Sequence, residues 1–292
     1  MLKDRIMISG FSDEIDSDFE RQLKTVTELG MNYISLRSAY DKNISAYSME
    51  EINDSLLPLL KSYQVKVSSI GSPIGKLDIR DNEGYVKQLV QLESLCNIAM
   101  QLQCKYIRIF SFYIPEGENP DEYHSEVIKK IKGFVEIANK YQRILIHENE
   151  KDIYGDIAKR CDKIVREINH PCFKLVFDFA NFVQCGENTV DCWNRLKDQV
   201  VYIHIKDALY NNSENVICGT GDGNILDLLR QILNEGYSGF LTLEPHLVMF
   251  DQLSELENRN AAEVIKTNKA KDGAEAYKIQ YNALMGMLSQ IA

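Results

Sequence analysis

Residues 144–178 read ILIHENEKDIYGDIAKRCDKIVREINHPCFKLVFD. Two short apolar runs, at 144–146 and 173–177, flank a longer stretch of mixed polarity. Apolar runs of this length predict buried β-strands. Six further runs of the same kind occur along the chain, and the eight predicted strands are Ile6–Ser9, Tyr33–Leu36, Val65–Ile70, Tyr106–Phe110, Ile144–Ile146, Phe173–Phe177, Val201–Ile205 and Phe240–Leu243.

The segments between the predicted strands have the apolar periodicity of amphipathic helices. Examples are Phe19–Leu29, which is followed by Gly30, and the stretches Tyr85–Leu102 and Val127–Tyr141. Alternating strands and helices favour parallel pairing, because parallel neighbours need a crossover that then covers the sheet. Eight such units predict an α/β fold of the (βα)8 TIM barrel type, with a doubly wound open sheet as the alternative.

The chain of 292 residues fits one large barrel core. Neither a Gly/Ser/Pro-rich linker nor a block of like charges interrupts the alternation, so we predict a single domain over residues 1–292. The last segment, Asn260–Ala292, predicts a closing helix. The charged stretch Lys266–Asp272 either continues this helix or breaks it as a loop.

Charge and composition indicate which kinds of partner and which cellular location to expect. The formal net charge of -10 argues against a protein that binds nucleic acid through a basic surface. No stretch approaches the roughly 18 apolar residues of a membrane span, and the first residues lack the apolar core of a signal peptide. We therefore expect a cytoplasmic protein whose partner is a small molecule rather than nucleic acid or a membrane, as a monomer or a homodimer. The seven cysteines lack paired spacing and are expected to be reduced and mostly buried.

Four potential metal ligands lie where the last four predicted strands end. Glu148 and Asp178 follow the fifth and sixth strands, His204 lies within the seventh, and Glu244 follows the eighth. In a (βα)8 barrel the carboxyl ends of the strands meet at one face, where the chemistry takes place. A lone Asp at a strand end is more often a turn former, and a lone His is more often a core residue. Several carboxylates brought together out of water need a compensating cation, so the coincidence predicts one divalent metal site.

The ligand set also bears on the identity of the ion. Three carboxylates and one imidazole form a mostly hard, oxygen-rich set, which suits Mn²⁺ or Mg²⁺ better than a thiolate-bound zinc site. Zn²⁺ and Co²⁺ remain open.

Other polar residues are candidates for binding a substrate beside the metal. Side chains two apart on a strand share a face, so each of three ligands nominates the residue two positions further on. Lys206 would hold a substrate oxyanion or phosphate, or would be an ordinary surface lysine. Arginines near two strand ends would do the same or form structural salt bridges, and an asparagine after the sixth strand would support a ligand or cap a helix. The six candidates are Glu150, Lys206, His246, Arg108, Arg37 and Asn181.

Two glycine-rich loops follow predicted strands. The run Gly219–Gly223 matches no nucleotide-binding fingerprint, and we interpret it first as a tight loop with Asn224 or Asp222 capping the next helix. A phosphate-cradling loop is the alternative, because adjacent backbone N–H groups attract anions. The loop Gly71–Lys76 has the same ambiguity.

These segments resemble the sugar phosphate isomerase/epimerase family, the xylose-isomerase-like barrels. The likeness spans essentially the whole chain, from Phe11-Ser12-Asp13-Glu14 to the last helix. The strings that carry it are Ile146-His147-Glu148-Asn149-Glu150, Phe177-Asp178-Phe179-Ala180-Asn181-Phe182, Tyr202-Ile203-His204-Ile205-Lys206-Asp207-Ala208, Gly236-Tyr237-Ser238-Gly239-Phe240 and Leu243-Glu244-Pro245-His246.

The resemblance implies a Glu-Asp-His-Glu metal site and a sugar or keto-acid substrate. This chain departs from common family patterns at Glu150, where a His often follows Glu-Asn, and at Ser35, where many relatives have Glu on the second strand. The usual sugar contacts of the family are therefore not expected to carry over unchanged.

The hypothesis for the reaction is a metal-dependent isomerase or epimerase that transfers a proton beside a carbonyl of a sugar, sugar phosphate or related keto compound. The metal would stabilise the enediolate, and Glu148 and Glu244 are the candidate catalytic base and acid. The closest alternative is a lyase or dehydratase on a keto-sugar or keto-inositol with the same site. A metal-dependent endonuclease resembling AP endonucleases and a metal-binding barrel without catalysis are further alternatives.

Overall fold

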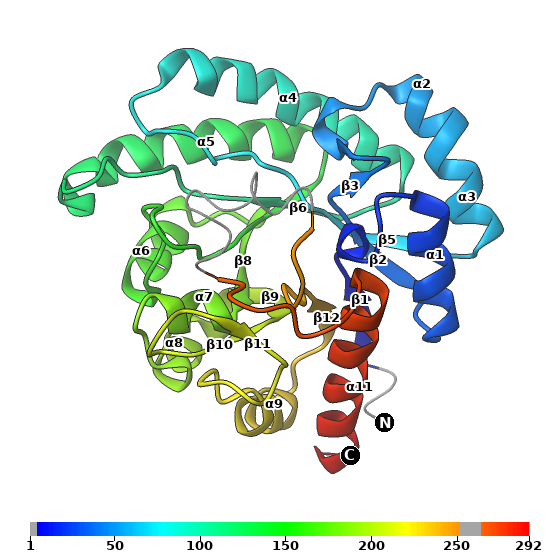
Figure 1. Cartoon of the computed structure of the whole chain (residues 1–292). Coiled ribbons are helices and arrows are strands. Elements are labelled where there is room, and N and C mark those ends of the chain that lie inside the picture. Colours follow the sequence, from blue (N-terminus) through cyan, green and yellow to red (C-terminus); the bar gives the residue numbers. More distant parts are fainter. Residues whose placement is uncertain (1–4, 251–263, 292) are drawn as a thin grey trace.

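Eight parallel strands form the central sheet of the protein, as the sequence predicts. The computed structural model describes residues 5–250 and 264–291. In Figure 1 the strands lie at the centre, and helices surround them. The strands are β1 (Ile6–Gly10), β2 (Tyr33–Leu36), β5 (Lys66–Ile70), β6 (Tyr106–Ile109), β7 (Ile144–His147), β8 (Phe173–Asp178), β9 (Val200–Ile205) and β12 (Gly239–Leu243).

The strand order closes the sheet into a barrel. From β2 to β12, each strand of this sheet pairs in parallel with the next one along the chain, and β12 pairs in parallel with β1. At the remaining seam, Phe11 just beyond β1 pairs with Ser35 of β2 in an isolated parallel bridge. A doubly wound sheet would leave two open edges, so the barrel prediction is confirmed and the open-sheet alternative is wrong.

Helices follow each strand and cover the outside of the barrel. The predicted helices after the first, third and fourth strands are confirmed as α1, α4 and α5, and α1 is followed by Gly30 with a left-handed φ of 75°. The helices are α1 (Phe19–Glu28), α2 (Met49–Glu51), α3 (Leu57–Ser62), α4 (Asn82–Gln101), α5 (His124–Lys140), α6 (Ala158–Ile168), α7 (Phe179–Gln184), α8 (Thr189–Leu196), α9 (Ile225–Asn234) and α11 (Gly273–Ile291).

The inside of the barrel has an apolar layer below a polar one. Ile146, Val176, Tyr202 and Phe240 form one buried cluster. Side chains two positions further along each strand point to the same face, toward the carboxyl ends. The polar layer therefore lies above this cluster, and the register pairs Asp178 directly with His204.

The C-terminal helix packs beside β12 and α9. The predicted closing helix is interrupted, because α11 begins only at Gly273 and residues 264–272 form turns and bends. Residues 260–263 and 292 of that prediction lie outside the described residues. Tyr277 of α11 packs so closely on β1 that a Cβ atom at Gly10 would lie 1.8 Å from the tyrosine oxygen. All seven cysteines are free, and five of them are buried, as expected.

Candidate metal centre

The four predicted ligands converge at the carboxyl end of the barrel. One donor atom from each of Glu148, Asp178, His204 and Glu244 lies within 4.8 Å of the others. All four side chains are buried, with at most 3% of any residue exposed. The convergence follows from the fold, because four neighbouring parallel strands end at the same height.

The backbone fixes the positions from which these ligands project. The sheet ladder continues past two strand ends, since the N–H groups of Glu148 and Glu244 donate to Ile109 and Ile205 at 3.0 and 3.2 Å. Asp178 ends β8 and also caps α7, where its Oδ1 atom accepts from the backbone N–H of Asn181 at 2.9 Å. Its Oδ2 atom is left to face the cluster.

His204 stands between the three carboxylates. Its Nδ1 atom lies 2.7 Å from Glu148 Oε1, 3.4 Å from Glu244 Oε2 and 3.7 Å from Asp178 Oδ2. Burial alone would lower the pKa of His204, but the carboxylates outweigh it and raise this pKa well above 6.5. The carboxylates around it therefore favour a positive charge at this position.

Three fixed cations support the same carboxylates. Lys206 Nζ lies 3.2 Å from both Asp178 Oδ2 and Glu244 Oε2. Arg108 Nη1 lies 3.1 Å from Glu148 Oε2, and Arg37 Nη1 donates to Glu244 Oε1 at 3.0 Å. All three predicted cations are thus brought to the centre.

Positively charged neighbours lower the pKa of two of the carboxylates. Burial would raise the pKa of Glu148, but the charges of His204 and Arg108 outweigh burial and lower this pKa to about 2. The pKa of Glu244 is lowered well below its usual value, because Lys206, His204 and His246 together outweigh burial.

The donor set fits a divalent cation. Asp178 Oδ2 and Glu148 Oε2 are buried and accept no hydrogen bond of good geometry from any described residue; their charged neighbours are Lys206 Nζ at 3.2 Å and Arg108 Nη1 at 3.1 Å. The carboxylates of the centre need a compensating positive charge, part of which the imidazole of His204 can carry. A divalent cation would take over that role, with the neutral imidazole as its nitrogen ligand and the carboxylates as its oxygen ligands.

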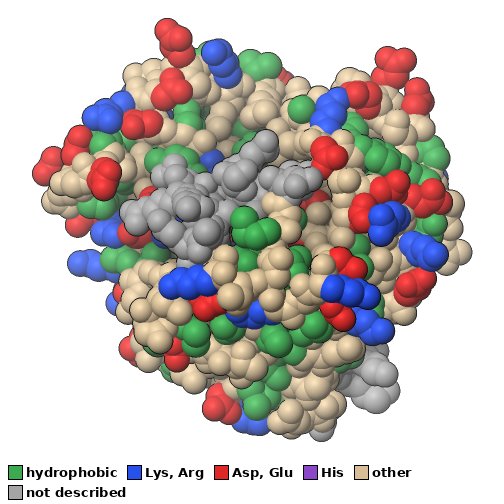
Figure 2. Space-filling view, in the orientation of Figure 1, with side chains coloured by type: hydrophobic (Ala, Val, Ile, Leu, Met, Phe, Trp, Pro, Cys, Tyr) green, Lys and Arg blue, Asp and Glu red, His purple; other side chains and the backbone are tan. Residues whose placement is uncertain are grey.

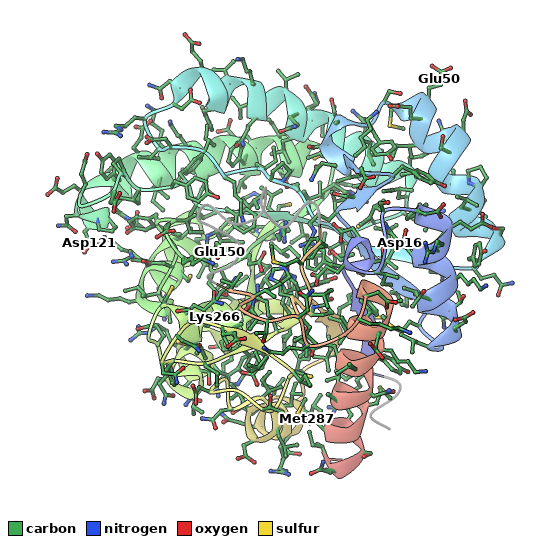
Figure 3. All side chains as sticks on the ribbon, viewed as in Figure 1. Asp16, Glu50, Asp121, Glu150, Lys266 and Met287 are labelled. Carbon is green, nitrogen blue, oxygen red and sulfur yellow. The ribbon has the colours of Figure 1, made fainter. Side chains whose placement is uncertain are left out.

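The other predicted substrate-binding residues occupy different places. Glu150 Oε2 lies 3.4 Å from Lys76 Nζ, and Figure 3 shows Glu150 inside the ring of helices, whereas Glu50 and Asp121 lie at the periphery. Asn181 contributes to the centre indirectly, because its side chain donates a hydrogen bond to the backbone oxygen of Asn149, the residue after Glu148, at 2.8 Å.

One part of the centre was missed at the sequence level. Asp13 and Glu14, just after β1, are buried and bind Arg37, whose Nε lies 2.7 Å from Asp13 Oδ2. The predicted residue His246 lies beside Glu14, with its Nε2 atom 3.4 Å from Glu14 Oε1. The strand-end rule that identified the four ligands would also have found the two acidic residues if it had been applied to the first strand.

The first glycine-rich loop is not a phosphate cradle. The N–H groups of Gly219, Gly221 and Gly223 donate to the carboxylate of Asp207 at 2.8 to 2.9 Å, so an internal anion occupies them. The predicted capping is wrong as well: Asn224 stands at the start of α9 without a side-chain capping bond, and Asp222 accepts instead from the N–H of Tyr210.

The second loop, after β5, is shaped by contacts with β6. Ser72 donates through its hydroxyl to the carbonyl of Arg108. Gly75 has a φ of 87°, and a Cβ there would lie 2.1 Å from the carbonyl oxygen of Phe110, so only glycine fits. This loop places Lys76 beside Glu150.

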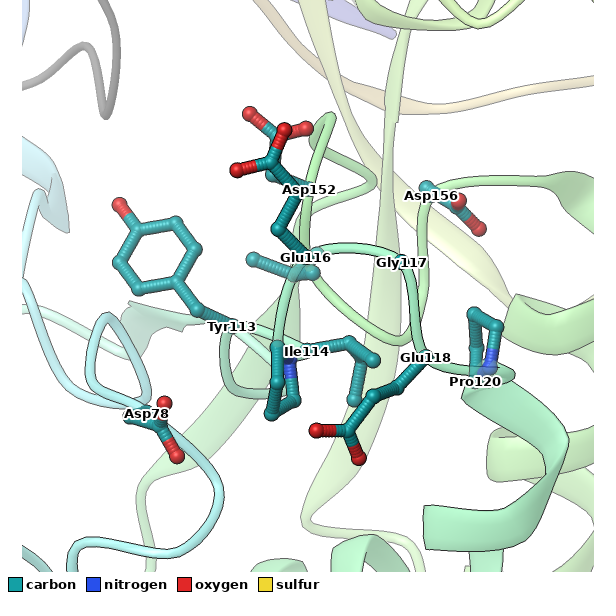
Figure 4. A pocket seen from close by; sticks show the side chains of 11 residues that line it. Asp78, Tyr113, Ile114, Glu116, Gly117, Glu118, Pro120, Asp152 and Asp156 are labelled. Carbon is teal, nitrogen blue, oxygen red and sulfur yellow. The ribbon is translucent and has the colours of Figure 1, made fainter.

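A cavity of about 690 Å³ lies among the loops after β5, β6 and β7 (Figure 4). Its walls carry several carboxylates, two of which are paired with Arg80, and none of the predicted site residues lines it. Figure 2 shows acidic and basic side chains interspersed on the visible face of the molecule. Among residues 5–250 and 264–291, no helix combines the length and apolar character needed to cross a bilayer.

Fold and site together define a (βα)8 barrel with a buried carboxylate and histidine cluster at the carboxyl ends of its strands. A family model described as xylose isomerase-like TIM barrel matches residues 23–267. The chain belongs to this family, and the resemblance to the sugar phosphate isomerase/epimerase barrels is confirmed.

Known proteins similar to this chain include enzymes of more than one reaction type. The 3-dehydroshikimate dehydratase of Bacillus anthracis is 21% identical over 196 residues, which cover 64% of this chain and 68% of that protein. The crystal structure of IOLI protein with a bound zinc atom has a TM-score of 0.74 and 16% identity, and covers 99% of both chains. The structure of a D-tagatose 3-epimerase-like protein has a TM-score of 0.72 and 17% identity, and covers 98% of this chain and 100% of the other. At these identities the solved structures support the fold alone.

Proposed function

We propose that this protein is a divalent-metal-dependent isomerase or epimerase that transfers a proton beside a carbonyl of a sugar, sugar phosphate or related keto compound. The observation that carries the proposal is the convergence of Glu148, Asp178, His204 and Glu244 in one buried cluster. Family membership supports an enzymatic role, because similar proteins include an epimerase-like protein and a dehydratase.

The same four residues would hold the metal. Mn²⁺ and Mg²⁺ suit the oxygen-rich set best, and Zn²⁺ and Co²⁺ are compatible with the imidazole. When bound, the ion supplies Lewis-acid polarisation of a substrate carbonyl, which makes the neighbouring C–H more acidic.

Glu148 and Glu244 are the proposed proton-transfer pair. Both are ionised, so either can accept a proton at a carboxylate oxygen. Each is oriented by an arginine on one oxygen: Arg108 lies at Glu148 Oε2 and Arg37 binds Glu244 Oε1. The two carboxylates come from the outer two of the four strands that carry the cluster, and we propose that they act on the two faces of a substrate carbon.

Lys206 is proposed to stabilise negative charge that develops on the substrate. Its Nζ atom is buried with the ligand carboxylates, and burial there strengthens its interaction with an oxyanion. Glu150, His246, Arg108, Arg37 and Asn181 are proposed to shape the same site.

The proposal is tested by exchange of substrate protons with deuterated solvent. A panel of ketoses, sugar phosphates and keto acids is incubated with the manganese-loaded protein, and exchange is followed by NMR. Glu148→Gln and Glu244→Gln should each reduce exchange by about 100-fold or more, whereas Glu93→Gln on α4 should leave it unchanged. Normal exchange in both site variants would refute the proton-transfer roles.

A dehydratase is the second candidate, favoured by the sequence similarity to the 3-dehydroshikimate dehydratase. Such an enzyme would remove a proton at the same position and expel a hydroxyl group. Incubation with 3-dehydroshikimate, followed by mass spectrometry and ultraviolet absorbance, distinguishes the two: a product lighter by one water supports the dehydratase, and an isomer of unchanged mass supports the isomerase.

We also propose that the partner of this protein is a small molecule and that the protein is cytoplasmic. It is proposed to be a monomer or a homodimer. Sedimentation analysis would decide between monomer and homodimer.

A further inference from the structure

A second group of metal-ligand atoms lies beside the proposed metal site and shares one residue with it. One donor atom from each of Glu14, Glu244 and His246 lies within 4.8 Å of the other two. All three residues are buried, with no more than 5% of any of them exposed. Glu244 divides its carboxylate between the two groups: Oε2 faces His204 and Lys206, and Oε1 faces Glu14 and His246.

The guanidinium of Arg37 contacts two of the three residues of this second group, Glu14 and Glu244. Its Nη1 atom lies 3.0 Å from Glu244 Oε1, its Nη2 atom 3.3 Å from Glu14 Oε1, and its Nε atom 2.7 Å from Asp13 Oδ2. Only 1% of Arg37 is exposed, and its charged carbon lies 4.4 Å from the centre of the Phe11 ring. Three carboxyl groups thus surround one buried cation that binds no other acidic side chain among the described residues.

His246 points a free nitrogen at the same place. Its Nε2 atom lies 3.4 Å from Glu14 Oε1 and 3.6 Å from Glu244 Oε1, yet it forms no hydrogen bond with any described residue. The backbone N–H of His246 donates to Glu14 Oε2 at 2.7 Å. Glu14 and His246 are therefore held together by a contact that does not involve Arg37.

We propose that the Arg37 guanidinium occupies the second cation position of a two-cation centre bridged by Glu244, and that it limits the protein to one exchangeable metal ion. The inference rests on the proposed function, because the first cation position is the metal site of that function. In sites with two metal ions, a carboxylate commonly bridges ions about 3.5–4 Å apart. Here a permanently charged side chain replaces one of the ions, and unlike an ion it cannot dissociate.

This arrangement has a consequence for the chemistry. Arg37 binds Glu244 Oε1, so the exchangeable ion would share Oε2 with Lys206 and His204. Displacement at phosphorus commonly uses two ions that hold the attacking and leaving oxygens, whereas proton transfer beside a carbonyl can proceed with a single ion. The fixed cation therefore favours proton transfer over a nuclease-like reaction.

Removal of the guanidinium tests the inference, because it should open the second position to a metal ion. In Arg37→Met, the carboxylates of Asp13, Glu14 and Glu244 lose their common cation, and two oxygen ligands and one nitrogen ligand remain in place. We expect two manganese ions per chain in this variant and one in the parent, measured by equilibrium dialysis with elemental analysis. Electron paramagnetic resonance should show a spin-coupled manganese pair in the variant alone.

Two further variants serve as controls. Arg108→Met removes a guanidinium that is also buried and also contacts a proposed ligand, Glu148, but that lies outside the Glu14 and His246 group. It should not gain an ion. The double variant Arg37→Met/His246→Phe removes a ligand of the second position and should return the count to one.

The outcomes separate this inference from the proposed function. A parent protein that binds no manganese would refute the proposed metal enzyme, whatever the variants do. An equal ion count in Arg37→Met and the parent would overturn the second cation position. A variant that stays unfolded at every manganese concentration would also overturn it, because the ion should then replace the guanidinium.

Discussion

Replacement of Asp207 by Asn should weaken the loop that follows β9, because the carboxylate organises four backbone N–H groups. Oδ2 accepts from Gly219 and Gly221 at 2.8 and 2.9 Å, and Oδ1 accepts from Ala208 and Gly223 at 3.0 and 2.9 Å. An asparagine has the same shape but only one acceptor oxygen. In either orientation of the amide, two N–H groups would face an NH₂ donor.

The magnitude follows from which pair loses its acceptor. The bonds from Ala208 and Gly223 are buried, so the amide oxygen should keep them, and the partly buried bonds from Gly219 and Gly221 should be lost. Bonds to a charged group contribute about 1.5–3 kcal/mol each when buried, and water can partly replace these two. We therefore expect the free energy of unfolding to fall by about 2 kcal/mol, which corresponds to a melting temperature lower by about 4–8 °C.

Urea unfolding followed by circular dichroism would measure this change. Asp207→Ala, which removes all four bonds, should be less stable than Asp207→Asn. The exposed Asp227 of α9 provides the matched control, and Asp227→Asn should change the stability by less than about 0.5 kcal/mol. If Asp207→Asn were as stable as the parent protein, the view of this loop as a glycine scaffold around an internal anion would be refuted.

Three further predictions follow from burial and close packing. Gly10→Ala should lower the melting temperature by several degrees, because its Cβ would lie 1.8 Å from the oxygen of Tyr277, and the double variant Gly10→Ala/Tyr277→Ala should lose less stability than the two single changes added together. Burial lowers the pKa of His147 to about 4, so between pH 4 and 6.5 the unfolded chain binds a proton at this residue and the folded protein does not. The free energy of unfolding should therefore fall by about 3 kcal/mol as the pH falls from about 6.5 toward 4. His147→Leu should flatten that part of the measured profile of stability against pH. Manganese at about 100 times its dissociation constant should stabilise the parent protein by about 2.7 kcal/mol in thermal unfolding, and a chelator should reverse the gain; an equal gain in Asp178→Asn would place the ion elsewhere.

The strands and the four ligand positions could be predicted because they depend on short-range patterns. An apolar run such as residues 144–146 is buried whatever its partners are, and the residue that follows it lies at the strand end. The parallel rule then brings Glu148, Asp178, His204 and Glu244 to one face without knowledge of any pairwise contact. This reasoning needs only the order of the elements.

The network around Arg37 could not be predicted in the same way. Arg37 binds Asp13 and Glu14 from the first loop and Glu244 from the end of the last strand, 207 positions along the chain. Which carboxylates an arginine meets depends on the closure of the barrel between β1 and β2. Until that closure is known, the sequence does not show whether Arg37 forms a structural salt bridge or contacts a substrate.

The sequence by itself determined the alternation of eight strands and helices, the face on which the polar residues gather and the chemical type of the ligand set, because each rests on local periodicity or on residue identity. Only the tertiary structure decided that Asp207 fills the glycine loop, that His204 stands among three carboxylates, and that Arg37 sits between Glu14 and Glu244. The physical reason is that charge compensation inside a barrel is a long-range property: it is set by strand closure and register, which place oppositely charged groups a few ångströms apart across the barrel.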